Sequence, residues 1–167
     1  MKLYIVRHAV AVSKNIPGPA DSERPLTEDG MADMRVGAVG LRGIGVRPKA
    51  ILSSPLVRAR QTAEILAREL CDGNAPIRIT EFLSPDGKLE QVYREIHRER
   101  RLESIMLVGH EPSLGEIAGS IVWGSPEYAI SLKKGGACAI DLERISPPPR
   151  GALLFLVTPG ILRALAR

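Results

Sequence analysis

Hydrophobic and polar positions fall into alternating blocks along the chain, and these blocks predict strands and helices in turn. A short apolar run over residues 2–7, rich in β-forming side chains, predicts the first strand. After Thr27, a favourable N-cap residue, apolar positions follow helical spacing to Leu41, where a segment containing glycine and proline ends the helix. The same criteria predict strands over residues 50–53, 77–79, 105–108, 137–142 and 152–157, and helices over residues 55–70, 89–96, 112–121 and 160–167.

This order of elements predicts an α/β fold. Repeated alternation of strand and helix favours a mainly parallel central sheet with helices on both faces. The last two strands, joined by the connection over residues 146–151, are expected to pair with each other. Because 167 residues fit one hydrophobic core, we expect a single three-layer domain over residues 1–167.

Composition sets several classes of protein aside. Hydrophobic residues make up 44% and charged residues 25% of the chain, a balance that excludes disorder over the whole length, collagen-like repeats and a coiled coil. The longest apolar stretch, residues 152–157, is too short to cross a bilayer, and Arg7 interrupts the N-terminal run before it reaches the length of a secretory signal.

Cys71 and Cys138 are isolated in sequence, so we expect two buried thiols in a reducing cytoplasm rather than a disulfide. These observations predict a cytoplasmic protein without a membrane partner.

The charged residues favour phosphate over nucleic acid as a ligand. The formal net charge is +4, and 17 of the 23 basic residues are arginine, whose planar guanidinium matches the geometry of phosphate. The densest arginine cluster, residues 94–101, is interrupted by glutamates, and aromatic residues make up only 4% of the chain. A nucleic-acid surface needs a clustered basic patch with interleaved aromatic residues, so no nucleic-acid partner is expected.

Three of the predicted strands end in groups suited to phosphoryl transfer. In parallel sheets, ligands bind beyond the carboxyl ends of the strands. Here Arg7 and His8 follow the first strand, Arg58 follows the second, and His110 follows the strand over residues 105–108. A neutral histidine can act as a nucleophile near pH 7, and two arginines can neutralise the oxygens of a phosphoryl group. Each residue also has an ordinary structural explanation, such as an ion pair or a capped carbonyl, but the four together favour a phosphate site.

Three segments, in this order, resemble the motifs of the histidine phosphatase superfamily. They are LYIVRHAVA at residues 3–11, SSPLVRARQTAE at residues 53–64 and VGHEP at residues 108–112. The segment RPLT at residues 24–27, with Gly30 and the absence of a large inserted cap, resembles the branch typified by the phosphohistidine phosphatase SixA. Ala9 stands where the family usually has glycine, a small change unless the backbone there requires a positive φ.

The resemblance implies a phosphoglycerate-mutase-like fold and a phosphatase that needs no metal and no organic cofactor. It implies that His8 becomes a phosphohistidine intermediate, with Arg7, Arg58 and His110 around the phosphoryl group. Arg24 is expected at the rim of the pocket or in an ion pair with an acidic neighbour.

The general acid is left open between two carboxylates. Larger members of the superfamily take this acid from the loop after the third strand, which here contains Glu81 and Asp86. Either residue could equally be a solvated turn residue or a charge at a helix N-terminus.

A phosphohistidine substrate reduces the need for a general acid, because imidazole is a far better leaving group than an unprotonated alkoxide. The resemblance therefore predicts a phosphohistidine-bearing protein, such as a phosphotransfer domain, as substrate and partner. Two alternatives are a small-molecule phosphomonoesterase of the same superfamily and a regulatory module that binds phosphate without turnover. Loss of an essential residue would mark such a module, and none of the four is missing.

Overall fold

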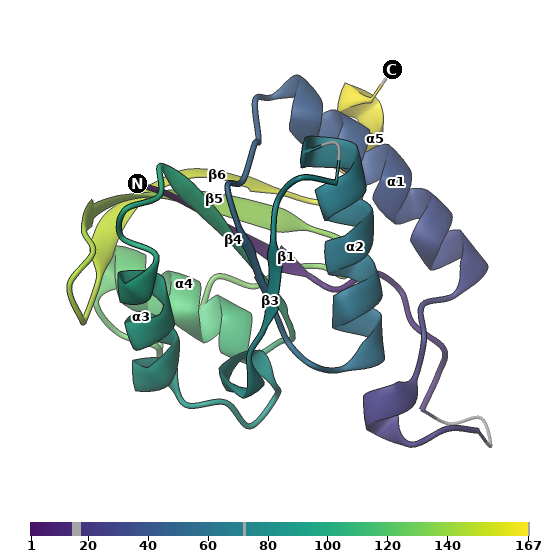
Figure 1. The fold of residues 1–167 in the computed structure, drawn as a ribbon, viewed down its shortest axis with the longest axis horizontal. Helices are drawn as coiled ribbons and strands as arrows, with labels where there is room; N and C mark the ends of the chain where they lie inside the picture. Colours follow the sequence, from purple (N-terminus) through teal and green to yellow (C-terminus); the bar gives the residue numbers. More distant parts are fainter. Residues whose placement is uncertain (15–17, 72, 167) are drawn as a thin grey trace.

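One six-stranded sheet organises the fold in the computed structural model, which describes residues 1–14, 18–71 and 73–166 (Figure 1). The strand order across the sheet is β3-β2-β4-β1-β5-β6. β3, β2, β4 and β1 pair in parallel, whereas β5 pairs antiparallel with both β1 and β6. The predicted mainly parallel sheet with a terminal strand pair is confirmed. In chain order the strands are β1 (Lys2–Arg7), β2 (Ile51–Ser53), β3 (Ile77–Ile79), β4 (Ser104–Gly109), β5 (Ala137–Arg144) and β6 (Arg150–Val157).

Helices cover both faces of this sheet, so the chain forms a single three-layer α/β domain (Figure 1). On one face lie α1 (Glu28–Gly43), α2 (Val57–Cys71) and α5 (Pro159–Leu165), and on the other lie α3 (Leu89–Arg98) and α4 (Ser113–Trp123). Two short 3₁₀ turns, η1 (Asp21–Glu23) and η2 (Glu81–Leu83), were not predicted. Within the described ranges, no helix is both long and apolar enough to cross a membrane.

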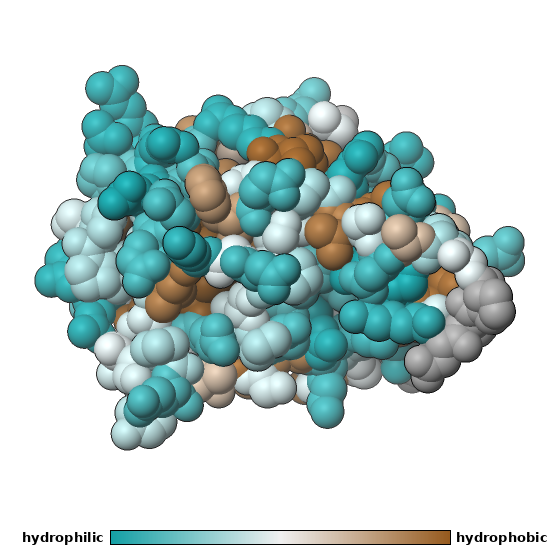
Figure 2. All heavy atoms as spheres, turned by 90° about the horizontal axis from the view of Figure 1, so that it is seen from below, coloured by the Kyte–Doolittle hydropathy of each residue, from teal (hydrophilic) through white to brown (hydrophobic). Residues whose placement is uncertain are grey.

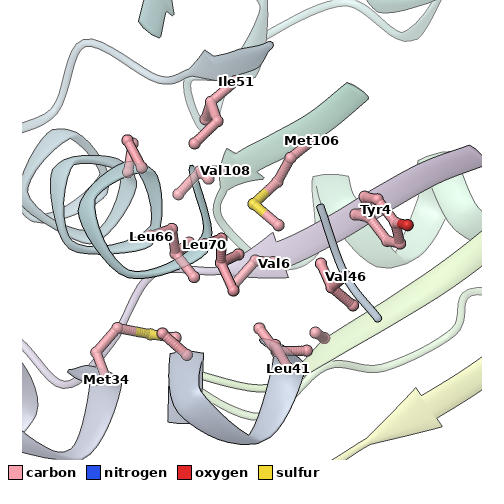
Figure 3. Close-up of a cluster of buried hydrophobic side chains, with 14 of the residues drawn as sticks. Tyr4, Val6, Met34, Leu41, Val46, Ile51, Leu66, Leu70, Met106 and Val108 are labelled. Atoms are coloured by element: carbon pink, nitrogen blue, oxygen red, sulfur yellow. The ribbon is translucent and has the colours of Figure 1, made fainter. Parts of the chain in front are cut away.

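The central strand β1 is buried on both faces, which explains why its sequence is a continuous apolar run. Because side chains alternate along a strand, Leu3 and Ile5 join the core under α3 and α4, while Tyr4 and Val6 join the core under α1, α2 and α5. Figure 3 shows this second cluster, where side chains from the sheet meet those of the helices. Its labelled members include Tyr4, Val6, Met34, Leu41, Ile51, Leu66, Leu70, Met106 and Val108.

The ends of the elements follow the predicted signals closely. The Thr27 hydroxyl caps α1 by accepting a hydrogen bond from the Gly30 N–H at 2.9 Å. The helix ends at Gly43, and Gly45 follows with a φ of 82°, which favours glycine. β5 and β6 are longer than predicted because their backbone pairing continues to Arg144 and Arg150, beyond the apolar runs.

The two cysteines differ in burial. Cys138 lies in the core, and burial raises the pKa of its thiol to about 12. Cys71 is partly exposed at the end of α2, with its Sγ 3.2 Å from the carbonyl oxygen of Pro48. Cys138 is buried as expected, but the expectation that both cysteines are buried is wrong for Cys71, because α2 ends at the protein surface.

Strand register brings the predicted site residues to one edge of the sheet. Arg7 pairs with Gly109 in the β1–β4 ladder, so the residues that follow, His8 and His110, leave neighbouring strands side by side. The His8 N–H donates to the carbonyl of Gly109 at 3.0 Å and extends this pairing by one residue. β2 adjoins β4 on its other side and leads into α2, which carries Arg58.

Candidate active site

A pocket of about 550 Å³ lies at this edge and is lined by all four predicted residues, Arg7, His8, Arg58 and His110. Figure 2 shows the molecule from below Figure 1, the side on which η1 and η2 lie, and hydrophilic side chains dominate that face. The remaining wall includes three cations, one carboxylate and a proline: Lys14, Arg24, Lys134, Glu111 and Pro85.

His8 is held as a neutral ring with one free nitrogen. Its Nδ1 lies 2.7 Å from the carbonyl oxygen of Ala9. Since a carbonyl only accepts, Nδ1 carries the proton and Nε2 keeps its lone pair. Burial lowers the pKa of His8 to about 4; the hydrogen bond to Ala9 opposes this shift, and the charges of Arg58 and Arg7 add to it. The ring can therefore supply an uncharged nucleophile at neutral pH.

Ala9, which stands in the family's usual glycine position, ties the end of β1 to α2. Its N–H donates to the Thr62 hydroxyl at 3.1 Å, and that hydroxyl donates to the carbonyl of Arg58 at 2.7 Å. Ala9 is buried in the core, so its methyl group has a packed environment. The backbone of the proposed nucleophile is thus fixed to the helix that carries Arg58.

His110 lies beside His8, and its ring is oriented by Ser54. The Ser54 hydroxyl accepts from the Leu56 N–H at 3.3 Å and lies 2.8 Å from Nε2 of His110. In the tautomer in which the Ser54 hydroxyl donates to Nε2, the proton of the neutral His110 ring lies on Nδ1. Among the residues described, no hydrogen-bond partner of this buried Nδ1 is present. A donor of this kind suits a phosphoryl oxygen.

The two arginines are anchored by some of their nitrogens and keep others unpaired. Arg7 Nη1 donates to the carbonyl of Leu132 at 2.8 Å. Arg58 donates from Nη1 to the carbonyl of Asp21 at 2.6 Å and from Nη2 to Asp21 Oδ2 at 3.1 Å. The Nε atoms of both arginines are buried and have no acceptor within the described part of the chain. Buried, charged donors of this kind favour an oxyanion ligand.

Asp21 is the acidic neighbour of the arginines at the pocket rim. Its carboxylate accepts from Arg24 Nε at 2.9 Å and from Arg58, and it lies 3.2 Å from Lys14 Nζ. Burial alone would raise the pKa of Asp21, but hydrogen bonds from Arg24 and Lys14 and the charge of Arg58 outweigh burial and hold it at about 2. Arg24 therefore both lines the pocket and forms the expected ion pair. The signal for Asp21 was its spacing of three residues before Arg24, which becomes meaningful only within the turn η1.

The structure does not bring Glu81 or Asp86 into this pocket. Both are exposed, and the Glu81 carboxylate accepts from the Ser84 hydroxyl at 3.4 Å. A different carboxylate, that of Glu111, lines the pocket next to His110. It accepts hydrogen bonds from the backbone N–H groups of Leu132 and Gly115, and burial raises its pKa. Glu111 is not among the residues that the sequence predicts for the site, although it directly follows a predicted site residue.

Within residues 1–14, 18–71 and 73–166, no group of three or more His, Cys, Asp or Glu side chains is arranged to hold a metal ion.

Comparisons with known proteins agree with the motifs. Residues 3–107 match the model of the histidine phosphatase superfamily (branch 1). The chain is 36% identical over 164 residues to an uncharacterized protein of Picosynechococcus sp., covering 95% of this chain and 97% of the relative. It is 30% identical over 128 residues to the phosphohistidine phosphatase SixA of Escherichia coli, covering 74% and 76% of the two chains. A solved structure of the protein histidine phosphatase SixA complexed with tungstate matches with a TM-score of 0.83 and 25% identity, covering 97% of this chain and 99% of the other.

Proposed function

The chain belongs to branch 1 of the histidine phosphatase superfamily, and from this premise we propose that it removes phosphate from phosphohistidine on partner proteins. Phosphatase activity itself is supported by the family and by the SixA relatives. The observation that carries the proposal is the pocket shared by His8, Arg7, Arg58 and His110, in which Nε2 of His8 keeps its lone pair. A phosphotransfer domain of a cytoplasmic signalling protein has the chemistry of the proposed partner.

In the first step, Nε2 of His8 attacks phosphorus and the phosphorus–nitrogen bond of the substrate breaks. Arg7 and Arg58 bind the non-bridging oxygens and neutralise the charge that spreads over them in the transition state. The leaving group departs as neutral imidazole once solvent has protonated its other ring nitrogen. Nδ1 of His110 donates a further hydrogen bond to the phosphoryl group.

In the second step, water attacks the phosphohistidine formed on His8. The new phosphorus–nitrogen bond breaks, inorganic phosphate leaves, and Nε2 regains its lone pair. The hydrogen bond between Nδ1 of His8 and the Ala9 carbonyl keeps the ring in one tautomer through both steps. No step requires a metal ion, so we expect full activity after treatment with a chelator.

The surroundings of the pocket support a protein substrate over a phosphate ester. Ester hydrolysis needs an acid for the alkoxide, but Glu81 and Asp86 lie outside the pocket and Glu111 already accepts two backbone hydrogen bonds. The connection between β3 and α3, residues 80–88, contains only the short turn η2 and no inserted helix or strand. Exposed Lys14 and Lys134 stand at the rim, where a large partner can approach.

A substrate panel tests this proposal. A histidine-phosphorylated phosphotransfer domain is compared with p-nitrophenyl phosphate and with sugar phosphates, using His8→Ala as the inactive control. We expect kcat/KM to be about a hundredfold higher for the phosphoprotein than for the esters. The reason is that imidazole leaves without a general acid, so the transition state of the phosphoprotein reaction is better stabilised. Preference for a small ester would support the phosphomonoesterase alternative, and phosphate binding without any turnover would support the regulatory module.

A further inference from the structure

The connection between α4 and β5, residues 124–136, is hydrogen-bonded to the end of β1 beside the pocket. The Gly135 N–H lies 3.1 Å from the carbonyl oxygens of both Arg7 and His8, and the carbonyl of Gly136 accepts from the Arg7 N–H at 3.2 Å. Lys134, in the same connection, lines the pocket. The position of this connection therefore influences where Arg7 and His8 lie.

Leu132 links two pocket residues through its own backbone. Its carbonyl oxygen accepts from Nη1 of Arg7 at 2.8 Å, and its N–H donates to Oε1 of Glu111 at 3.0 Å. The Leu132 side chain is buried in the core, which limits how far this backbone can shift. A single peptide segment thus joins the Glu111 carboxylate to the Arg7 guanidinium.

Glu111 is itself held firmly between α4 and the connection. Its carboxylate also accepts a hydrogen bond from the Gly115 N–H, and the Gly115 carbonyl accepts from the Ile130 N–H at 3.0 Å. A side chain at position 115 would place its Cβ 2.8 Å from Oε2 of Glu111 and 2.9 Å from the Ile130 carbonyl oxygen. Only glycine leaves room for this arrangement, so Glu111 occupies a fitted position.

We infer that Glu111 is a positioning residue for phosphate binding: by fixing the backbone of Leu132, it orients Arg7 and leaves the rest of its guanidinium for the phosphoryl group. The inference rests on the proposed function, which assigns phosphate binding to Arg7, and it adds the residue that sets the orientation of Arg7. Glu111 exchanges no proton with the substrate.

Two conservative variants separate the reach of the Glu111 side chain from its charge. Glu111→Asp keeps the charge but is one methylene too short to accept from the Leu132 N–H, whereas Glu111→Gln keeps the reach and loses the charge. The readout is the affinity for inorganic phosphate, measured by titration calorimetry on the full chain. We expect phosphate binding to be about tenfold weaker for Glu111→Asp, because this variant loses the hydrogen bond from the Leu132 N–H. For Glu111→Gln, which keeps that hydrogen bond, we expect a change within about threefold. Glu127→Ala, which removes an exposed carboxylate from the same connection, should leave the affinity unchanged.

A double-mutant cycle tests whether the effect passes through Arg7. In an Arg7→Ala background, Glu111→Asp should cause no further loss of phosphate affinity. Equal losses in both backgrounds would overturn the inference, and so would a loss in Glu111→Gln as large as in Glu111→Asp, which would assign a role to the charge. If the unmodified protein binds no phosphate, or binds it equally well without Arg7, the proposed function fails instead.

Discussion

The rings of His8 and His110 lie side by side in the pocket wall, with centroids 5.0 Å apart and ring planes tilted by 56°. Burial lowers the pKa of His8 to about 4 and that of His110 to about 3. Burial is the largest cause for both rings, and the charges of Arg58 and Arg7 add to it. The pKa of His110 is lowered further because a proton on its ring would be repelled by a proton on His8. A proton on either ring would place a positive charge beside Arg7 and Arg58, so both rings are neutral in the free protein at pH 7.

This relationship predicts the acid limb of the pH profile. The proposed nucleophile must be neutral, and the neutral fraction of a group falls as the pH drops through its pKa. Because the pKa of His8 is about 4, we expect kcat/KM to hold nearly constant from pH 7 to pH 5 and to fall only as the pH approaches 4. Steady-state kinetics with an aryl phosphate, corrected for the ionisation of the substrate, measures this limb, with circular dichroism to verify folding at each pH. A midpoint near 6.5, the value of an unperturbed histidine, would contradict the neutralising effect of the pocket.

The contact between Arg58 and Asp21 predicts that lysine cannot replace Arg58. The guanidinium donates from two nitrogens to Asp21 and still presents Nε, whereas an ammonium group has a single nitrogen. We expect Arg58→Lys to lower kcat/KM by at least about a hundredfold through lost transition-state stabilisation. Arg60→Lys, an exposed arginine of the same helix, is the matched control and should leave kcat/KM unchanged. Comparable activities of the two variants would remove Arg58 from the phosphate site.

Close packing between α1 and the segment after the nucleophile predicts an effect at Gly30. A Cβ at this position would lie 2.1 Å from the carbonyl oxygen of Val10, a backbone atom that cannot move aside cheaply. We expect Gly30→Ala to destabilise the fold by about 1–3 kcal/mol, the usual cost of overpacking, and to lower activity because Val10 follows His8 closely. The change is measured by urea unfolding.

Gly37 in the same helix provides the control for this substitution. A Cβ there would meet only side-chain atoms, the nearest being Met34 Cε at 3.6 Å, which is ordinary contact. Gly37→Ala should therefore be neutral, or stabilising by up to about 1 kcal/mol through helix propensity. A larger loss in Gly37→Ala than in Gly30→Ala would contradict the packing argument.

The elements of the fold that the sequence predicts correctly are those marked by residues close together in the chain. The apolar run of β1 and the cap at Thr27 are local signals, and both elements form where they were expected. The convergence of Arg7, His8 and His110 was also accessible, because residues that follow parallel strands meet at one edge of the sheet.

The parts of the site that were missed depend on contacts between loops. Asp21 meets Arg58 across 37 positions of sequence, and Glu111 meets Leu132 across 21. Polar residues in irregular segments carry no periodicity, so nothing in the sequence marks these pairs. The acid candidates Glu81 and Asp86 were chosen from a position in the chain rather than from a pattern, and the path of the loop leaves both outside the pocket.

The proposed nucleophile gives the sharpest separation of catalysis from binding. His8→Ala should abolish turnover, and circular dichroism should show an unchanged fold because the ring faces the pocket. Rapid quench with labelled substrate should trap a phosphorus–nitrogen adduct on His8 that is stable in base and labile in acid. His110→Ala keeps Nε2 of His8 and should still form this adduct, only more slowly.

Two in-line displacements give net retention of configuration at phosphorus, so a chiral phosphoryl substrate should yield phosphate with retained stereochemistry. Inversion would instead mean that water attacks the substrate directly, and it would remove the covalent role of His8 even if the pocket binds phosphate as expected.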